Sequence, residues 1–328
     1  MTAPRLELAL SEGGLPLPGD GLIAVFGPRA GDDLGALPKD RVVVITGFAP
    51  DYAAFQSAGY ACAVAPEGRF CMSLVFVARA KKLAQALVAQ AASVTDGVVV
   101  VDGAKTDGID SMLKSCRQRG DVTGPVNKAH GKLFWFQGGD FSDWASAGPA
   151  RLPDGWVTAP GVFSADGVDP ASALLASVLP AKIGARVADL GAGWGYLSAR
   201  LLERDTIRQV DLVEADHSAL ECARVNVGDP RAKFHWADAT TWRPDTLFDA
   251  VVSNPPFHHS RAADPGIGQG FIRAAGRMLR PGGRLWIVAN RHLPYETVMA
   301  DVFGKVEEVG GDSRFKVLLA VRSSRHPR

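Results

Sequence analysis

The chain has 328 residues, of which 47% are apolar and 22% charged, a composition typical of globular proteins that bury a full core. This length favours two domains. The net charge of +1 excludes a globally basic nucleic-acid-binding protein, so a nucleic-acid partner would have to meet a local basic surface.

The positions of the cysteines and the hydropathy of the chain indicate the cellular compartment. The four cysteines, Cys62, Cys71, Cys116 and Cys222, are scattered without the spacing of a metal site, which favours buried free thiols in a reducing compartment. Residues 1–20 lack a basic start followed by an apolar core, and the longest apolar runs are far too short to span a bilayer. We therefore expect a cytoplasmic protein with no metal site and no membrane association.

The first half of the chain alternates short apolar runs with amphipathic stretches. Apolar runs bounded by Gly, Pro or Asp predict buried strands, and apolar residues spaced by three or four predict helices. The expected strands are Leu22–Phe26, Val42–Ile45, Leu74–Val77, Gly97–Val101 and Leu133–Phe136, and the expected helices are Ala80–Ala92 and Asp107–Arg119. Alternation of strand and helix predicts a parallel, doubly wound sheet.

The segment Gly138–Gly155 is rich in Gly, Ser, Ala and Pro, which is typical of a linker. We therefore expect two domains, residues 1–145 and 146–328. A weak internal echo supports this division, because Val100–Lys105 and Trp286–Arg291 each lead into a helix and then an apolar final strand. The echo predicts a duplicated domain, and chance similarity between two α/β units is the alternative.

The second half repeats the strand–helix alternation. Its expected helices are Asp169–Leu179, a helix ending near Glu203, Ser218–Val225 and Ile267–Leu279, and its expected strands are Gln209–Glu214, Lys233–Trp236, Asp249–Val252 and Arg284–Ala289, the last entered by a turn at Arg280–Gly283. A last helix and two strands are expected to end the chain.

The most informative stretch is Val187–Leu197, a short strand, a glycine-rich turn and a helix start. Gly191, Gly193 and Gly195 leave no Cβ in the turn, so that a ligand can approach the backbone closely. Dinucleotide-binding folds use a similar turn, but Asp189 would repel a pyrophosphate and suits a cationic group such as the amino group of S-adenosylmethionine. A tight turn without a ligand is the alternative.

Further polar residues follow the next predicted strands, whose carboxyl ends line the ligand crevice of an open α/β sheet. Glu214 stands about 20 residues beyond the glycines, where an acid hydrogen-bonds ribose hydroxyls, with Asp216 as the second choice. Asp238, followed by Ala239, could accept a hydrogen bond from an adenine amino group. A solvated strand end and a turn-forming aspartate are the alternative interpretations.

The tetrapeptide Asn254–Phe257 is the most specific feature. Its two prolines remove donors and fix the backbone, so carbonyl groups can face the crevice. The Asn254 side-chain oxygen and the Pro255 carbonyl could together accept both protons of a planar amino group, and Phe257 offers a ring on which a base can stack. A rigid loop after a core strand is the alternative.

These features stand in the order found in class I S-adenosylmethionine-dependent methyltransferases, which the second half resembles. With Pro160–Ser164, Ser253–His258, Lys105–Asp110 and Lys128–Lys132, the chain more closely resembles the bacterial 16S ribosomal RNA small-subunit guanine-N2 methyltransferases. The resemblance implies an α/β fold of two tandem doubly wound, Rossmann-like domains, the second active and the first degenerate. Pro170 departs from the family, which often has an apolar residue there.

The resemblance implies methyl transfer from S-adenosylmethionine, leaving S-adenosylhomocysteine, to the exocyclic N2 amine of a guanine in small-subunit RNA. Asn254, Pro255 and Phe257 would orient the amine. His258 or His259 could take the leaving proton or contact phosphate, and a polar loop is the alternative for both. Phe163 would close over the cofactor or belong to the core.

Ribosomal RNA is the expected partner of a monomeric enzyme, through a modest basic excess in the first domain and the tail residues Arg322, Arg325 and Arg328. The first-domain candidates are Lys105, Lys114, Arg117, Lys128 and Lys132, for which solvated helix faces are the alternative. Other acceptors remain open: a guanine of the large subunit, adenine N6 or a protein glutamine. A non-catalytic ribosome-assembly factor is the alternative of another class, and Asp189 disfavours an oxidoreductase.

Overall fold

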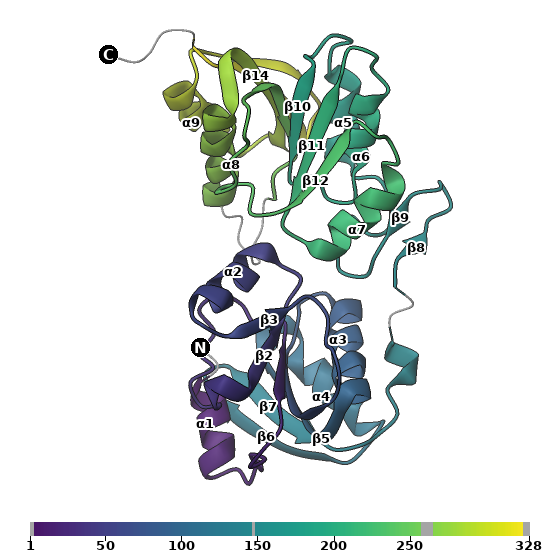
Figure 1. The fold of residues 1–328 in the computed structure, drawn as a ribbon, viewed down its shortest axis with the longest axis vertical. Helices are drawn as coiled ribbons and strands as arrows, with labels where there is room; N and C mark the ends of the chain where they lie inside the picture. The colour runs from purple at the N-terminus through teal and green to yellow at the C-terminus, as the bar shows by residue number, and fades with distance from the viewer. Residues whose placement is uncertain (1–2, 146–147, 257–264, 324–328) are drawn as a thin grey trace. The chain divides into compact units, whose positions relative to one another are not determined.

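A computed structural model describes residues 3–145, 148–256 and 265–323. The chain divides into two compact units, Met1–Gly148 and Pro149–Arg328 (Figure 1). The division falls three residues after the expected boundary between residues 145 and 146. Each unit is a complete α/β domain with its own sheet of seven strands.

The first domain begins with a helix that the sequence did not predict and then alternates strands with helices. Its helices are α1 (Ala3–Ser11), α2 (Ala49–Ser57), α3 (Lys81–Val94) and α4 (Ile109–Arg117). Its strands are β1 (Ile23–Phe26), β2 (Val42–Ile45), β3 (Ala61–Ala63), β4 (Phe70–Phe76), β5 (Thr95–Ala104), β6 (Val122–Lys128) and β7 (Gly131–Phe136). The strand order is β3-β2-β1-β4-β5-β7-β6.

The second domain has the same strand order, preceded by a small hairpin of β8 (Ala150–Arg151) and β9 (Val157–Thr158). Its helices are α5 (Pro170–Val178), α6 (Tyr196–Leu202), α7 (His217–Asn226), α8 (Pro265–Met278) and α9 (Tyr295–Val302). Its sheet has the order β12-β11-β10-β13-β14-β16-β15. The strands are β10 (Arg186–Leu190), β11 (Gln209–Glu214), β12 (Ala232–Trp236), β13 (Phe248–Ser253), β14 (Leu279–Asn290), β15 (Lys305–Gly311) and β16 (Phe315–Val321).

Both sheets are mixed, whereas the strand–helix alternation predicts parallel sheets. The first five strands of each sheet pair in parallel, but β7 pairs antiparallel with β5 and β6, and β16 pairs antiparallel with β14 and β15. A short hairpin connection, from Lys128 to Gly131, requires antiparallel neighbours, because a parallel pair needs a long crossover. The prediction of a parallel sheet in the first half was therefore wrong for β7, which runs opposite to both of its neighbours, and β16 runs opposite to its neighbours in the same way.

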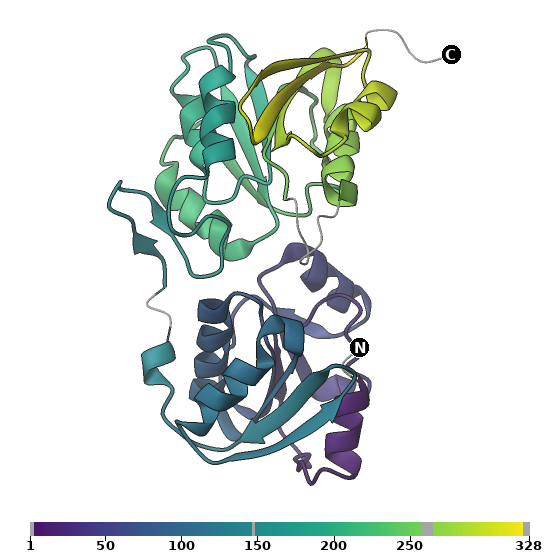
Figure 2. The ribbon, with the colours of Figure 1, turned by 180° about the vertical axis from the view of Figure 1, so that it is seen from behind.

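Helices cover both faces of each sheet, which accounts for the near-continuous apolar runs of the central strands. In the second domain, α8 and α9 pack on one face, and α5, α6 and α7 pack on the other (Figures 1 and 2). In the first domain, α3 and α4 cover one face while α1 and α2 contribute to the core on the opposite face. The carboxyl ends of the parallel strands are left for loops, which is where a ligand site is expected.

The two domains share hydrogen-bonding register as well as strand order. Gly27 donates its N–H to the carbonyl of Ile45 at 2.9 Å, and Gly191 donates to the carbonyl of Val213 at the same distance. The internal similarity predicted from the sequence is also present in the structure. The Lys105 N–H donates to the carbonyl of His130, and the equivalent Arg291 N–H donates to the carbonyl of Arg314. These shared bonds align the two sheets residue by residue.

Several local expectations differ from the structure. The turn expected at Arg280–Gly283 lies inside β14, where the register with β13 shifts between Phe248, which pairs Leu279, and Ala250, which pairs Arg284. The expected linker is partly core, because Phe141 and Trp144 pack on the first domain. Of the cysteines, Cys116 and Cys222 are buried, whereas Cys62 and Cys71 are half-buried.

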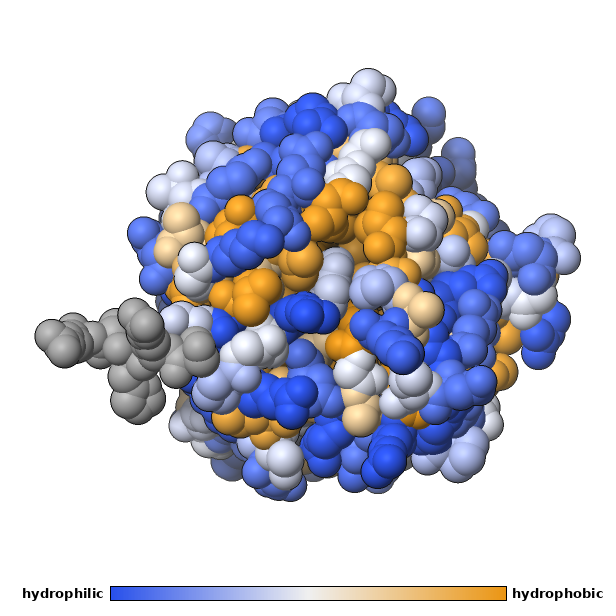
Figure 3. Space-filling view, turned by 90° about the horizontal axis from the view of Figure 1, so that it is seen from above, coloured by the Kyte–Doolittle hydropathy of each residue, from blue (hydrophilic) through white to orange (hydrophobic). Residues whose placement is uncertain are grey.

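The surface shown in Figure 3 carries small apolar groups interrupted by hydrophilic residues. Among the described residues, no helix is long and apolar enough to cross a membrane.

Candidate active site

The second sheet has a topological switch point between β10 and β13. From β10 the chain returns through α6 on one face, and from β13 it continues through α8 on the other, so a crevice opens at the carboxyl ends of these two strands. The register places Leu190 beside Ser253, so the neighbouring residues Asp189 and Asn254 come from adjacent strands at this crevice. The structure therefore brings together two residues predicted from separate motifs.

Two positions in the turn after β10 require glycine for different structural reasons. Gly193 has a φ of 55°, and a Cβ at this position would project into open space beside the crevice. Gly195 has a φ of 91°, and a Cβ there would lie 2.8 Å from a methyl group of Val227. Gly193 thus keeps the crevice open, whereas Gly195 allows α6 to begin close to the helix α7.

Asp189 is a fully buried carboxylate with one unsatisfied oxygen. Its Oδ2 accepts a hydrogen bond from the hydroxyl of Ser198 at 2.7 Å, while its Oδ1 has no partner among the described residues. Burial, assisted by the nearby negative charge of Glu214, raises the pKa of Asp189 to about 7. A buried acid in this condition would be stabilised as a carboxylate by a cationic ligand group.

Glu214 supports the glycine turn from the end of β11. Its Oε2 accepts the N–H of Gly193 and its Oε1 accepts the N–H of Asp216, both at 2.8 Å. Burial raises the pKa of Glu214. The alternative acid, Asp216, caps α7 by accepting the N–H groups of Ser218 and Ala219 with its Oδ1.

Asp238 follows β12 and shapes the next loop. Its Oδ1 accepts hydrogen bonds from the backbone N–H and the hydroxyl of Thr240, at 2.8 and 2.7 Å. The neighbouring Ala239 is buried. This arrangement fits the turn-forming interpretation and leaves Oδ2 as the oxygen that could face a ligand.

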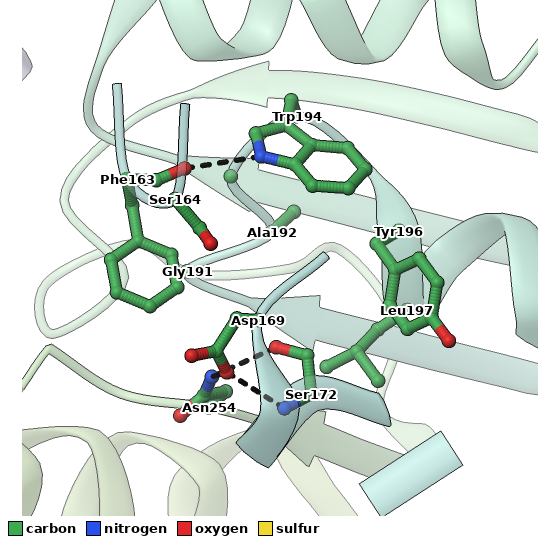
Figure 4. Close-up of a pocket in the computed structure, with 11 residues that line it drawn as sticks. Phe163, Ser164, Asp169, Ser172, Gly191, Ala192, Trp194, Tyr196, Leu197 and Asn254 are labelled. Carbon is green, nitrogen blue, oxygen red and sulfur yellow. Dashed lines mark hydrogen bonds between the residues drawn. The ribbon is translucent and has the colours of Figure 1, made fainter. Parts of the chain in front are cut away.

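Asn254 is held in one orientation by two residues from the start of α5 (Figure 4). Its Nδ2 donates to Oδ2 of Asp169 and to Oγ of Ser172, both at 2.8 Å. Asp169 also caps α5 by accepting the N–H of Ser172. With the amide nitrogen fixed in this way, the buried Oδ1 of Asn254 is left without a partner among the described residues. Pro255, which follows, is buried as well.

A pocket lies over the glycine turn, Asn254 and the start of α5, with about 370 Å³ of empty space that is partly open to solvent, and Asp189, Glu214 and Asp238 are not among the residues that line it. The glycine turn and Asn254 line it, together with Phe163, whose side chain is 55% exposed, so the core alternative for Phe163 is wrong. Figure 4 shows Trp194 beside this loop, where its indole Nε1 donates to the carbonyl of Phe163 at 3.1 Å. The turn and the Phe163 loop therefore support each other.

Asn226, at the end of α7, links the glycine-rich turn after β10 to the hairpin of β8 and β9. Its Oδ1 accepts the N–H of Val157, and its Nδ2 donates to the carbonyls of Val157 and Trp194, all at 2.8 Å. One side chain on α7 is thus hydrogen-bonded both to β9 and to the glycine-rich turn after β10. Sequence patterns gave no indication of this contact.

Comparison with known proteins agrees with this geometry. The methyltransferase small domain model matches residues 155–319. The ribosomal RNA small subunit methyltransferase C of Shewanella amazonensis is 30% identical over 87% of this chain and 90% of its own length. The protein of the same name from Shewanella oneidensis is 31% identical over 76% of this chain and 77% of its own.

The chain belongs to the ribosomal RNA small subunit methyltransferase C family. It is therefore an S-adenosylmethionine-dependent methyltransferase. The solved structure of the T. thermophilus 16S rRNA N2 methyltransferase RsmC, in complex with AdoMet and guanosine, matches 97% of this chain and 92% of its own. With a TM-score of 0.77 at 23% identity, that structure shows the fold of both tandem domains.

The described residues fit the family's cofactor. The orphaned Oδ1 of Asp189 suits the cationic amino group, and the absent Cβ of Gly193 leaves room beside the turn. Glu214 would hold the ribose, and Asp238 with Ala239 would meet the adenine. Phe257, His258 and His259 lie outside the described residues.

Two contributors were not identified as site residues from the sequence. Asp169 was visible only as a helix start, and Ser172 carried no signal. Their contact with Asn254 joins residues 85 and 82 positions apart, which no local pattern encodes. A third contributor, Ser198, lies only 9 positions from Asp189, but no sequence signal marked its hydroxyl as a partner of that carboxylate.

The first-domain basic candidates lie on different elements. Lys105, which follows β5, and Lys128, at the end of β6, are both exposed, and the Lys105 N–H donates to the carbonyl of His130 in the β6–β7 turn. Lys132 is paired with Asp110 at 2.6 Å. Lys114 and Arg117 are exposed on α4, and Arg117 donates to the carbonyl of Gly124.

Proposed function

We propose that this chain transfers the methyl group of S-adenosylmethionine to the exocyclic N2 amine of a guanine in 16S ribosomal RNA. Membership of the ribosomal RNA small subunit methyltransferase C family supports the RNA substrate. The name of the T. thermophilus neighbour, an N2 methyltransferase in complex with guanosine, supports the acceptor base.

The observation that carries the proposal is the orientation of Asn254. A carboxylate and a hydroxyl both engage its amide nitrogen, so Oδ1 is the atom left for a ligand. An oxygen acceptor recognises an amino group, whereas a phosphate or carbonyl would require a donor. The side chain is therefore prepared for an amine acceptor before any substrate arrives.

The chain's own residues position the acceptor. Oδ1 of Asn254 would accept one proton of the guanine amine and the Pro255 carbonyl the other, which fixes the plane of the amine. Phe257 would stack on the base, and His258 could accept the proton that the amine loses. Bound S-adenosylmethionine supplies a methyl group on a sulfonium, reactive enough for positioning to carry much of the catalysis.

We extend the proposal to substrate recognition. Lys105 and Lys128 are exposed basic residues of the first domain, and Lys114 with Arg117 adds charge on α4. Lys132 contributes less, because Asp110 neutralises it. These residues would contact phosphates, and the enzyme would act as a cytoplasmic monomer on RNA within the small subunit.

The test is transfer of labelled methyl from S-adenosylmethionine to small subunits, large subunits and naked ribosomal RNA from a strain lacking this gene. Label recovered as N2-methylguanine from small-subunit RNA, and lost with Asn254→Ala, is the expected result. Arg224→Gln, which changes an exposed arginine already paired with Glu221, is the matched control.

Each alternative acceptor has its own outcome. Label on large-subunit RNA would change the substrate and keep the chemistry, whereas label recovered as N6-methyladenine or in protein would overturn the guanine assignment. Absence of label from every RNA, with cofactor bound, would favour an assembly factor and sink the proposal.

A further inference from the structure

Two arginine side chains converge on one loop of the catalytic domain. Arg277, on α8, donates from Nη2 to the carbonyl of Thr240 at 2.8 Å. Arg243 donates from Nη1 to the carbonyls of Thr241 and Trp242, each also at 2.8 Å. Consecutive carbonyls of a three-residue loop thus hold two guanidinium groups that come from separate parts of the chain.

The two positive charges are not neutralised by the protein. Both side chains are exposed, and neither has a carboxylate within 4 Å among the residues that the structure describes. Two other exposed arginines of this domain differ, since Arg224 pairs with Glu221 at 3.0 Å and Arg280 with Asp249 at 2.9 Å. Partial burial, and then the charge of Arg243, lower the pKa of Arg277. An anion between the two groups would relieve this repulsion.

The geometry leaves most of the donors free for such an anion. A guanidinium carries five N–H donors in a planar fork, and each of these two commits only one NH₂ group to the loop. The planar fork matches the oxygens of a phosphate, which it can bind through two parallel hydrogen bonds. The loop carbonyls hold each guanidinium in place, which lowers the entropy lost on binding.

The loop is tied to the cofactor side of the active site. Thr240 is fixed by Asp238, and a Cβ on Gly270 of α8 would lie 3.2 Å from the Thr240 methyl group. The same helix carries Phe271, which would be 3.1 Å from a Cβ on Gly191. A phosphate bound by the two arginines would therefore lie on the elements that build the methyl-transfer site.

We propose that Arg243 and Arg277 form a binding site for a backbone phosphate of the substrate RNA. This inference rests on the proposed function and assigns to the catalytic domain its own contact with the RNA, separate from the lysines of the first domain. Because phosphate contacts position an RNA without reading its sequence, the site would set the register of the strand beside Asn254.

The test measures RNA affinity across a series of salt concentrations for R243Q, R277Q and the double variant. Glutamine keeps a polar side chain while the charge and the terminal NH₂ groups that contact the loop carbonyls are lost. Each single variant is expected to bind unmethylated 16S ribosomal RNA about tenfold more weakly. Because the double variant can no longer bind that phosphate, its slope of log affinity against log salt should be reduced by about 1. Arg224→Gln should keep both values.

Affinity for S-adenosylmethionine, measured by calorimetry without RNA, distinguishes loss of the positive charge from structural damage to the loop as the cause of weaker RNA binding. It is expected to stay at the wild-type value in all three variants, and the charge-retaining R243K and R277K should recover part of the RNA affinity, because lysine keeps the charge but not the planar fork. An unchanged salt slope, or parallel loss of cofactor affinity that lysine does not repair, would overturn this inference alone. Failure of the wild-type enzyme to methylate any ribosomal RNA would overturn the proposed function and this inference together.

Discussion

The two domains have the same strand order and the same register, yet they differ at the carboxyl ends of their strands. The shared hydrogen bonds of Gly27 and Gly191 align Asp189 with Val25 and Glu214 with Thr46. The pairing of β4 with β1 aligns Asn254 with Phe76. Each of these three polar residues thus has an apolar or uncharged counterpart in the first domain.

The first domain also has a buried charge that the second lacks. Asp102 of β5 occupies the register position of Val288, and it forms a bidentate ion pair with Arg5 of α1, with N–O distances of 2.5 and 2.9 Å. The same sheet therefore tolerates an acid at a different strand end when a helix supplies its partner. The comparison shows that topology fixes the place of a site, whereas a few side chains decide whether a site exists.

Asp102→Val, which copies the second domain into the first, should have the largest effect. It leaves the guanidinium of Arg5, 7% exposed, buried without its carboxylate, and we expect the first domain to lose about 3–5 kcal/mol of unfolding free energy. Urea denaturation of the full chain would measure the loss. Arg5→Met combined with Asp102→Val should restore most of it, and a single variant as stable as the wild type would show that the pair is dispensable.

Asn254→Ala should lower kcat by about 10²–10³, because the amine loses the acceptor that orients it. Single-turnover methyl transfer is the appropriate measurement, with the melting temperature as a check on folding. Phe76→Leu at the aligned position of the first domain should leave kcat unchanged. Equal losses in both variants would mean that general destabilisation, and not orientation of the amine, explains the effect.

The carboxylate of Asp189 predicts a pH dependence that the first domain cannot have. Because burial raises its pKa to about 7 without ligand and a cationic amino group favours the ionised form, cofactor affinity should rise with pH up to about 7 and then level off. Below that value it should fall about tenfold per pH unit. Calorimetry between pH 5.5 and 8 measures this, and Asp189→Asn should flatten the curve, apart from a residual slope from Glu214. An identical curve in Asp189→Asn would assign the titration elsewhere.

Ser172→Ala should have the smallest effect, since Asp169 still holds the Asn254 amide. Loss of one hydrogen bond predicts a decrease in kcat/KM of about 3- to 10-fold, expressed in kcat. Ser172→Thr, which keeps the hydroxyl, should recover the rate. If Ser172→Ala raised only the KM for RNA, Ser172 would instead contribute to substrate binding.

The strands that carry a strong apolar pattern could be predicted from the sequence, and so could the polar residues at their carboxyl ends. Asp189, Glu214 and Asn254 were found because each ends an apolar strand, and the parallel topology then requires these ends to meet. The strands β6 and β15 were harder to predict, since β6 contains a Pro and a Gly and β15 two glutamates, and neither buries a continuous face. Asp169, Ser172 and Ser198 escaped prediction because their roles come from tertiary contacts alone.

The hydrogen bonds of Asn226 limit where this chain can be shortened. The Asn226 side chain bonds both the N–H and the carbonyl of Val157, and it also bonds the carbonyl of Trp194 in the glycine turn. A fragment that starts after Thr158 would leave Asn226 with one of its three hydrogen bonds, the one to the carbonyl of Trp194. A fragment of the second domain that keeps these contacts must therefore start upstream of β9.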